Sequence, residues 1–215
     1  MTDVINKKLE AFLVDYPLKK YKKGQVILEA GQEVSSVYWT RSGYAWAYDL
    51  DDMDREVGIQ IFQPLEFLSI LSVKTGNKSR HNVESLTPVE VWVIPKNDFE
   101  KFLKNNEEVA KAIDLEVAEK FLDLTDYISQ LVSGDAYKKV AGYLYNLAKE
   151  FGVNRGCKIN VKFKITHRLI ASMTGLTRET VTLQMLKMEK KRLIDNEKRQ
   201  VTILDRNKLK ESLGY

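Results

Sequence analysis

The hydrophobic pattern changes along the chain, and its first part predicts short strands. From about Leu18 to about Val93, apolar and aromatic residues alternate with polar ones in runs broken by glycines, as in "QVILEAGQEVSSVYWTRSGYAWAYDL", "REVGIQIFQ" and "PVEVWVIP". Alternation with a period of two indicates half-buried strands, and many short strands at this spacing favour a small antiparallel sandwich or barrel. We therefore expect a β-rich N-terminal domain.

A helical period replaces the alternation from about Lys96 to Val132. A first helix is expected from Asp98, followed by a long helix over "EEVAKAIDLEVAEKFLDLTDYISQLV". Apolar residues along this long helix are spaced four, four, three, four and three apart, at Ile113, Val117, Phe121, Leu124, Ile128 and Leu131. Such a stripe packs either on the chain's own sheet or on the same helix of a second copy. Because Val109 and Leu115 leave a further apolar face, we favour a parallel dimer.

The break "SGD" at 133–135 precedes a helix over "AYKKVAGYLYNLAKEFG", a loop, and the segment "ITHRLIASMTGLTRETVTLQMLKMEKKRLI" at 165–194. We expect that segment to form two short helices capped by Thr166 and Thr177 and joined at Gly175. Their buried positions are expected to be Ile170, Met173, Val181, Met185 and Met188. The segment has a small residue, a glycine four positions later and a valine six positions after that glycine. This spacing is typical of a helix-turn-helix, in which the second helix enters the DNA major groove. Two strands, "LIDN" and "QVTILD", follow around the turn "EKR".

Charge is distributed unevenly and supports a polyanionic partner for the C-terminal third. Residues 1–136 hold 16 Lys and Arg against 23 Asp and Glu, a net charge of −7. Residues 137–215 hold 18 against 7, a net charge of +11, so the whole chain carries +4. A basic surface alone is more often a solvated face, and the helix-turn-helix spacing is what favours double-stranded DNA.

The residues on and around the second short helix suit distinct DNA contacts. Arg178 matches guanine O6 and N7 or a phosphate, and Glu179 matches the cytosine N4 amino group. Thr166, His167 and Thr177 stand at helix starts, where phosphate binds, and Lys198 and Arg199 form the turn of a wing. The candidate DNA-binding residues are Thr166, His167, Thr177, Arg178, Glu179, Thr182, Leu183, Lys187, Lys198 and Arg199.

Other classes of protein find little support in the composition. The chain contains no run of about 18 apolar residues that could span a membrane, and its N-terminus lacks a secretory signal. We therefore expect a cytoplasmic protein. The single Cys157 excludes an intramolecular disulfide or a four-cysteine metal site. His81 and His167 lie far apart in sequence, so we expect no enzyme, no metal and no cofactor.

The segment 165–194 resembles the winged helix-turn-helix of the Crp/Fnr family, the cyclic-AMP receptor and fumarate–nitrate reduction regulators. The resemblance extends through the terminal "TILDRNKL" and back to "YKKGQVILEAGQEVSSVYWTRSG", and so covers nearly the whole chain. It implies an α+β fold with an N-terminal antiparallel β-roll over 1–106, a cyclic-nucleotide-binding-like jelly roll. It further implies a dimerisation helix over 107–134 and a winged helix-turn-helix over 135–215. The implied protein is a homodimeric transcription regulator on a palindromic operator, with RNA polymerase as a possible further partner.

Two departures from the family's pattern lie in the DNA-binding part. Leu183 occupies the place where the family usually has an Arg that reads guanine. Either Leu183 meets a thymine methyl group, which we favour, or Leu183 and Leu186 pack on a neighbouring element. Arg192 stands where the family usually has Gly, for which we have no account beyond an extra phosphate contact.

The β-roll departs from the family's cyclic-nucleotide pocket. Glu66 and Arg80 resemble the family's ribose-binding carboxylate and phosphate-binding Arg, but Leu65 takes the usual Gly place and His81 the usual Ser or Thr place. We therefore expect an unknown small-molecule effector other than cyclic AMP, with Glu66, Arg80 and His81 as candidate contacts. A cyclic-nucleotide-responsive regulator remains an alternative, as does DNA binding without any effector.

A protein of another class also fits the leucine-bearing helix. A degenerate family member would use this helix for protein–protein interaction. Salt dependence distinguishes the two readings, since phosphate contacts release counterions and affinity then falls steeply with salt.

Overall fold

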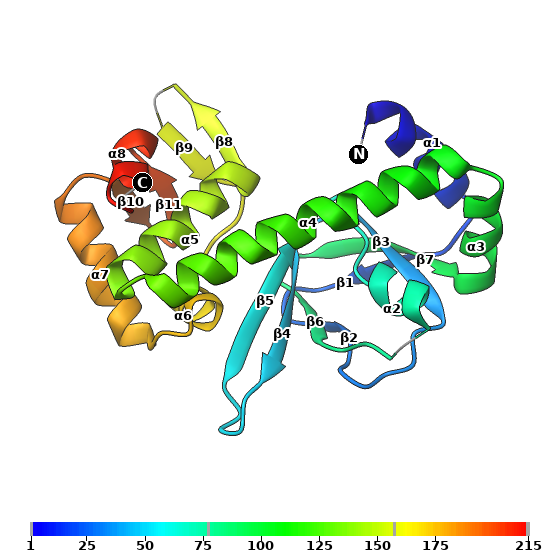
Figure 1. Ribbon diagram of the computed structural model, residues 1–215, viewed down its shortest axis with the longest axis horizontal. Helices are drawn as coiled ribbons and strands as arrows, with labels where there is room; N and C mark the ends of the chain where they lie inside the picture. The colour runs from blue at the N-terminus through cyan, green and yellow to red at the C-terminus, as the bar shows by residue number, and fades with distance from the viewer. Residues whose placement is uncertain (1, 77, 157, 214–215) are drawn as a thin grey trace. The chain divides into compact units, whose positions relative to one another are not determined.

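The computed structural model describes residues 2–76, 78–156 and 158–213, so Cys157 lies outside the described residues. The chain divides into two compact units. One comprises the chain up to Asp49 together with Ile59–Leu124, and the other comprises Leu50–Gly58 together with the chain from Thr125 onward. Figure 1 shows the elements of both units, and each unit is described below by itself. Among the described residues, no helix has both the length and the apolar character needed to cross a bilayer.

Two antiparallel sheets build the first unit, as the alternating pattern predicted. One sheet has the order β1 (Leu18–Tyr21), β7 (Val89–Pro95), β3 (Ser36–Ser42). The other has the order β2 (Val26–Leu28), β6 (Asn82–Ser85), β4 (Ala45–Leu50), β5 (Glu56–Phe62). Trp39 of β3 lies opposite Trp92 of β7 in the register, and the Trp39 ring is fully buried. The aromatic residues of the sequence therefore serve in part as core.

Helices complete the core of this unit. They are α1 (Asp3–Leu13), α2 (Ile70–Thr75) and α3 (Lys96–Lys104). The sequence pattern did not single out α1, although its Leu9 and Leu13 are fully buried against Trp39 and Phe99 in one cluster. The helix expected from Asp98 begins two residues earlier, at Lys96.

The long helix α4 (Glu107–Ser133) forms over the predicted range, but its apolar stripe is divided between two faces. Ile113 is only 2% exposed and belongs to the core cluster of its own unit, against which Val117 also packs. The expectation of one dimer seam running from Ile113 to Leu131 is therefore wrong for Ile113, which is buried within its own unit. Phe121, Leu124 and Ile128 of the predicted stripe are exposed, and together with Val132 they form what we call the exposed line of α4. Leu115 and Leu122 are exposed elsewhere on the helix.

The second unit contains a four-helix cluster and a small sheet. Its helices after α4 are α5 (Ala136–Phe151), α6 (His167–Thr174), α7 (Arg178–Lys190) and α8 (Arg206–Glu211). The sheet has the order β10 (Ile194–Glu197), β11 (Gln200–Ile203), β9 (Lys158–Val161), β8 (Gly152–Arg155), all antiparallel. The two strands predicted at 193–196 and 200–205 are confirmed as β10 and β11. The hairpin of β8 and β9 stands where the sequence predicted only a loop.

Candidate nucleic-acid interface

The helix pair α6 and α7 forms with the caps and turn that the sequence predicted. The Thr166 hydroxyl accepts a hydrogen bond from the Leu169 amide at 3.1 Å, and the Thr177 hydroxyl accepts one from the Thr180 amide at 3.2 Å. Gly175 adopts a φ of 66°, in the left-handed region that favours glycine. These bonds satisfy amides at the helix starts that have no partner within the helix.

The buried stripe of α7 fixes which of its faces is free. Val181, Met185 and Met188 are buried, as are Ile170 and Met173 of α6. Because α5, α6 and α7 contact one another, this apolar core determines how α7 is rotated. The opposite face carries the exposed side chains Arg178, Glu179, Leu183, Leu186, Lys187 and Lys190.

Leu183 and Leu186 do not pack on a neighbouring element of this chain. Leu183 is 58% exposed and Leu186 is 48% exposed. The alternative in which both leucines are buried internally is therefore wrong. The two leucines therefore lie on the solvent-exposed side of α7, among its charged residues.

Two of the predicted DNA-binding residues, His167 and Thr182, contact each other. Nδ1 of His167 lies 2.8 Å from the Thr182 hydroxyl, which in turn donates to the Arg178 carbonyl at 2.8 Å. Nε2 of His167 lies 3.1 Å from Nδ2 of Asn196 on β10. Burial, followed by the charge of Arg178, lowers the pKa of His167 from its ordinary value. Asn196 could not be identified from the sequence, because nothing local joins β10 to the start of α6.

The turn between β10 and β11 presents two exposed cations, as expected for a wing. Lys198 and Arg199 have φ of 52° and 67°, so both central residues of this two-residue turn are left-handed. Such a turn matches the twist of the two strands, and Asn or Gly usually occupies it. Here the sequence places exposed basic side chains at the tip despite the conformational cost.

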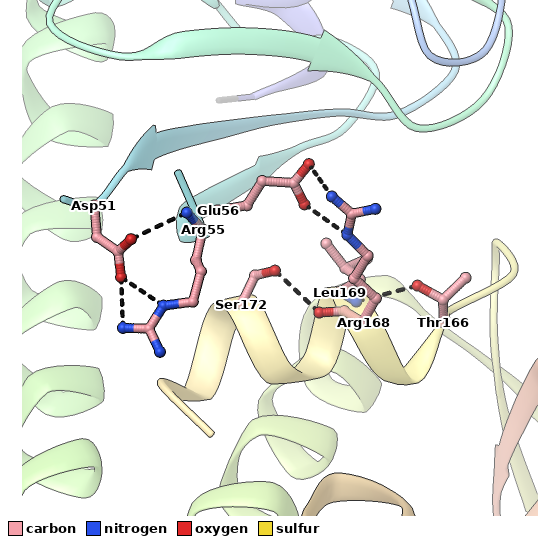
Figure 2. A network of polar contacts seen from close by, with 7 residues as sticks. All are labelled: Asp51, Arg55, Glu56, Thr166, Arg168, Leu169 and Ser172. Carbon is pink, nitrogen blue, oxygen red and sulfur yellow. Dashed lines mark hydrogen bonds and ion pairs between the residues drawn. The ribbon is translucent and has the colours of Figure 1, made fainter. Parts of the chain in front are cut away.

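The tip of the β4–β5 hairpin belongs to the same compact unit as α6, and an ion pair joins the two. Figure 2 shows the Arg168 guanidinium directed at the Glu56 carboxylate. Nε and Nη2 of Arg168 donate to the two Glu56 carboxylate oxygens at 3.2 and 2.8 Å. Within the tip, the Arg55 side chain binds Asp51 at 2.8 Å, and these bonds lower the Asp51 pKa to about 2. The Arg168 guanidinium is therefore already occupied by a carboxylate. Residue types alone did not indicate this pairing.

The β-roll residues considered for an effector have separate partners. The Glu66 carboxylate accepts from the Gln63 amide at 3.2 Å and pairs with Lys120 of α4 at 3.0 Å. Nδ1 of His81 lies 2.9 Å from the Asp49 carboxylate. The Arg80 side chain is exposed. The structure thus engages Glu66 and His81 in contacts within the fold.

Leu65 keeps the backbone conformation of the glycine that the family pattern has there. Its φ is 70°, its amide donates to the Thr40 carbonyl at 2.7 Å, and its side chain packs on the core. A leucine in this conformation is strained, since Cβ approaches the backbone. The side chain fills space that a glycine would leave open.

Two family models match the chain, one over each part. Residues 18–106 match the cyclic nucleotide-binding domain, and residues 138–212 match the Crp-like helix-turn-helix domain. Together the two matches cover most of the chain. The relatives that match this chain are named as regulators, among them a global transcriptional regulator.

Relatives and solved structures extend this likeness over nearly the whole length. The global nitrogen regulator of Nostoc sp. is 25% identical over 86% of this chain and 84% of its own length. The cAMP-activated global transcriptional regulator CRP of Haemophilus influenzae is 24% identical over 86% of this chain and 83% of its own length. The structure of FixK2 from Bradyrhizobium japonicum superposes with a TM-score of 0.80 at 18% identity, covering 92% of this chain and 97% of that one. The fold is therefore shared, while one of the two relatives is a nitrogen regulator and the other is activated by cAMP.

Proposed function

Because the chain belongs to the Crp/Fnr family of DNA-binding transcription regulators, we propose that it reads its operator with the exposed face of α7. The single observation that carries this proposal is the grouping of Arg178, Glu179 and Leu183 on one exposed face. In helix-turn-helix proteins the N-terminal residues of the second helix reach base edges. We call α7 the recognition helix below.

Each exposed residue of the recognition helix has a defined chemical role in this proposal. Arg178 donates to guanine O6 and N7 or to a phosphate, and Glu179 accepts from a cytosine N4 amino group. The helix starts at Thr166 and Thr177 lie against phosphates, where hydroxyl and backbone N–H groups suit anions. Lys187, Lys198 and Arg199 add cations for the flanking backbone.

Leu183 takes the thymine methyl group as its partner. An aliphatic side chain cannot form the hydrogen bonds by which Arg reads guanine, so the operator should carry an A·T pair at this position. Full burial of a leucine contributes about 1.5 to 3 kcal/mol. Since Leu183 is 58% exposed, we expect about 1 to 1.5 kcal/mol for each half-site, or roughly five- to twelvefold in affinity.

The test combines a protein methyl deletion with a DNA methyl deletion. Operators are first selected from a random duplex library at two salt concentrations. Binding of wild type and Leu183→Ala is then measured on the selected operator and on one with deoxyuracil replacing the facing thymine. We expect Leu183→Ala alone and deoxyuracil alone each to weaken binding. When both changes are combined, binding should be little weaker than with either one alone.

Val153→Ala is the matched control, because Val153 is 44% exposed and lies on β8, away from the recognition helix. Full additivity of the two deletions would contradict the role of Leu183. If no sequence is enriched and the affinity is insensitive to salt, the recognition helix meets a protein partner, as the alternative reading holds.

We propose that the protein is a homodimer through the exposed line of α4. Phe121 is 64% exposed and Ile128 is 50% exposed, and both lie on this line with Val132. Apolar side chains of this size repeated along a 27-residue helix favour pairing with a second copy. A twofold dimer places two recognition helices on the inverted halves of a palindromic operator.

Sedimentation velocity distinguishes the two faces of α4. We expect Phe121→Ser with Ile128→Ser to give a folded monomer with the circular dichroism of wild type. Ile113→Ser should instead lower the free energy of unfolding, because Ile113 lies in the core of its own unit. A stable dimer in the Phe121, Ile128 double variant would place the interface elsewhere.

We further propose that the β-roll responds to a small molecule other than cyclic AMP. Glu66 is engaged by Lys120 and Gln63, and Leu65 fills the space that a glycine would leave for a phosphate. A regulator of this kind works in the cytoplasm, where contact with RNA polymerase is expected at its promoters. Calorimetric titration with cyclic AMP tests the proposal, and binding at micromolar concentration would favour the cyclic-nucleotide-responsive alternative.

A further inference from the structure

Three elements of the second unit meet at the imidazole of His167. The residue itself begins α6, its Nδ1 contacts Thr182 of the recognition helix, and its Nε2 contacts Asn196 of β10. The distances of 2.8 and 3.1 Å are those of ordinary hydrogen bonds. The imidazole is thus shared between the helix that carries Arg178 and the strand that leads to the wing turn.

The direction of each hydrogen bond follows from a single hydroxyl proton. Thr182 donates that proton to the Arg178 carbonyl at 2.8 Å, so its oxygen can only accept from His167. Nδ1 must therefore carry the imidazole proton, which leaves the lone pair of Nε2 for the Asn196 amide group. Burial and the nearby charge of Arg178 lower the pKa of His167, while Glu189 acts in the opposite direction. The neutral form is the one that this arrangement of partners requires.

We propose that His167 is a positioning residue, which as a neutral Nδ1–H imidazole holds the recognition helix and the wing in one fixed relation. The inference rests on the proposed function, since its consequence is that both elements reach the same duplex. His167 is then not a phosphate ligand, which is the role that its place at a helix start suggested.

The contacts lie close to the groups whose placement they control. Thr182 directly precedes Leu183, and its hydroxyl bonds the first residue of the recognition helix through the Arg178 carbonyl. Asn196 lies opposite Val201 in the β10–β11 register, two residues before Lys198. Loss of the imidazole would free the wing to move relative to the base-reading residues.

Two conservative substitutions separate the two contacts. His167→Asn places an amide nitrogen where Nδ1 stands and reaches Thr182 but falls short of Asn196. His167→Gln extends the amide toward the position of Nε2 and reaches Asn196 but leaves Thr182. Neither variant removes the Thr166 cap of α6, so both should fold as wild type does, which circular dichroism and the unfolding midpoint check.

The main measurement is a double-mutant cycle on operator affinity. The wing pair Lys198→Ala and Arg199→Ala is combined with wild-type His167, His167→Asn and His167→Gln. We expect the wing substitutions to weaken operator binding by the wild-type protein. Their effect should be at least about threefold smaller in His167→Asn, which has lost the contact with Asn196. In His167→Gln, which keeps Asn196 but has lost Thr182, the effect should also fall, because the wing is then no longer tied to the recognition helix. Additive behaviour in both variants would overturn the proposal, and so would a reduced salt slope in each, which marks a lost phosphate contact.

A second measurement uses the free protein and needs no DNA. Two-bond proton–nitrogen correlation spectra of the imidazole should show Nδ1 protonated and Nε2 bare at neutral pH. An Nε2–H tautomer or an imidazolium would overturn the assignment. If wild type binds no operator, the proposed function fails while this spectrum still decides the state of His167; if it binds and the cycle is additive, the function stands and the positioning role fails.

Discussion

Replacing Arg192 by glycine should stabilise the protein, although it removes a large side chain. Arg192 follows the recognition helix with a φ of 53°. Its amide donates to the Glu189 carbonyl at 2.8 Å, and the Leu193 amide donates to the Met188 carbonyl at 3.0 Å. This pair of bonds is the Schellman motif, in which the left-handed residue is usually glycine. The left-handed conformation accounts for the glycine that the family usually has at this position, and Arg192 adopts the same conformation.

The magnitude follows from two opposing effects. A left-handed residue with a Cβ costs about 1 to 2 kcal/mol, and glycine removes this cost. Glycine also gives the unfolded chain more freedom, which costs roughly 0.5 to 1 kcal/mol. The Arg192 side chain is exposed, so little packing is lost. We expect Arg192→Gly to raise the free energy of unfolding by about 0.5 to 1 kcal/mol, or roughly 1 to 4 °C in the midpoint.

The assay is urea unfolding followed by far-ultraviolet circular dichroism, with two controls. Arg192→Ala removes the guanidinium but keeps Cβ, and it should leave stability nearly unchanged. Gly175→Ala is the reverse experiment, since Gly175 has a φ of 66° and a Cβ there would contact nothing within 4 Å. It should lower stability by about 1 kcal/mol. A loss of stability in Arg192→Gly, or a gain in Gly175→Ala, would refute the reasoning.

Three further outcomes follow from the structure. Gly43→Ala should lower stability by about 2 to 4 kcal/mol in urea unfolding, because Gly43 has a φ of 85° and an added Cβ would collide with the Pro88 carbonyl; wild-type stability would contradict this. Leu65→Gly, tested in the same way, should lower stability by roughly 1 kcal/mol, since lost packing outweighs the relieved φ; a gain would show that strain dominates. The carboxyl pKa of Asp51, followed by NMR, should be about 2 and should rise toward its ordinary value in Arg55→Met. Because the pKa is lowered in the folded state, the Asp51–Arg55 pair contributes to stability above the ordinary pKa, and this contribution is lost as the pH falls through about 2.

The helix-turn-helix was predictable from the sequence because its determinants are local. Thr166 and Thr177 cap helices that begin one residue later, and Gly175 supplies the left-handed turn between them. A helical period of 3.6 residues alone decides that Val181 and Met185 share a face. The same periodicity leaves Leu183 on the other side of the helix, where it is exposed.

The two faces of α4 could not be separated by periodicity. Ile113 and Phe121 belong to the same spacing in sequence, yet one is buried in its own unit and the other is exposed. The heptad pattern indicates that a helix has an apolar stripe and does not say which neighbour covers it. Ile113 is buried because α4 contributes it to the core cluster that contains Trp39 and Phe99.

The polar contacts that define the sites were decided by the tertiary structure alone. Glu56 and Arg168 are 112 residues apart, and Glu66 meets Lys120 only because α4 passes the segment between β5 and α2. A charged residue in a sequence carries no information about which distant partner it will find. The amino-acid pattern by itself determined most of the elements, the caps, the turn and the family likeness, since these depend on neighbours within a few residues, but it did not indicate α1 or the β8–β9 hairpin. Which side chains are free for DNA and which, like His167, are held inward depended on long-range packing, because burial and hydrogen-bond partners exist only once the elements are assembled.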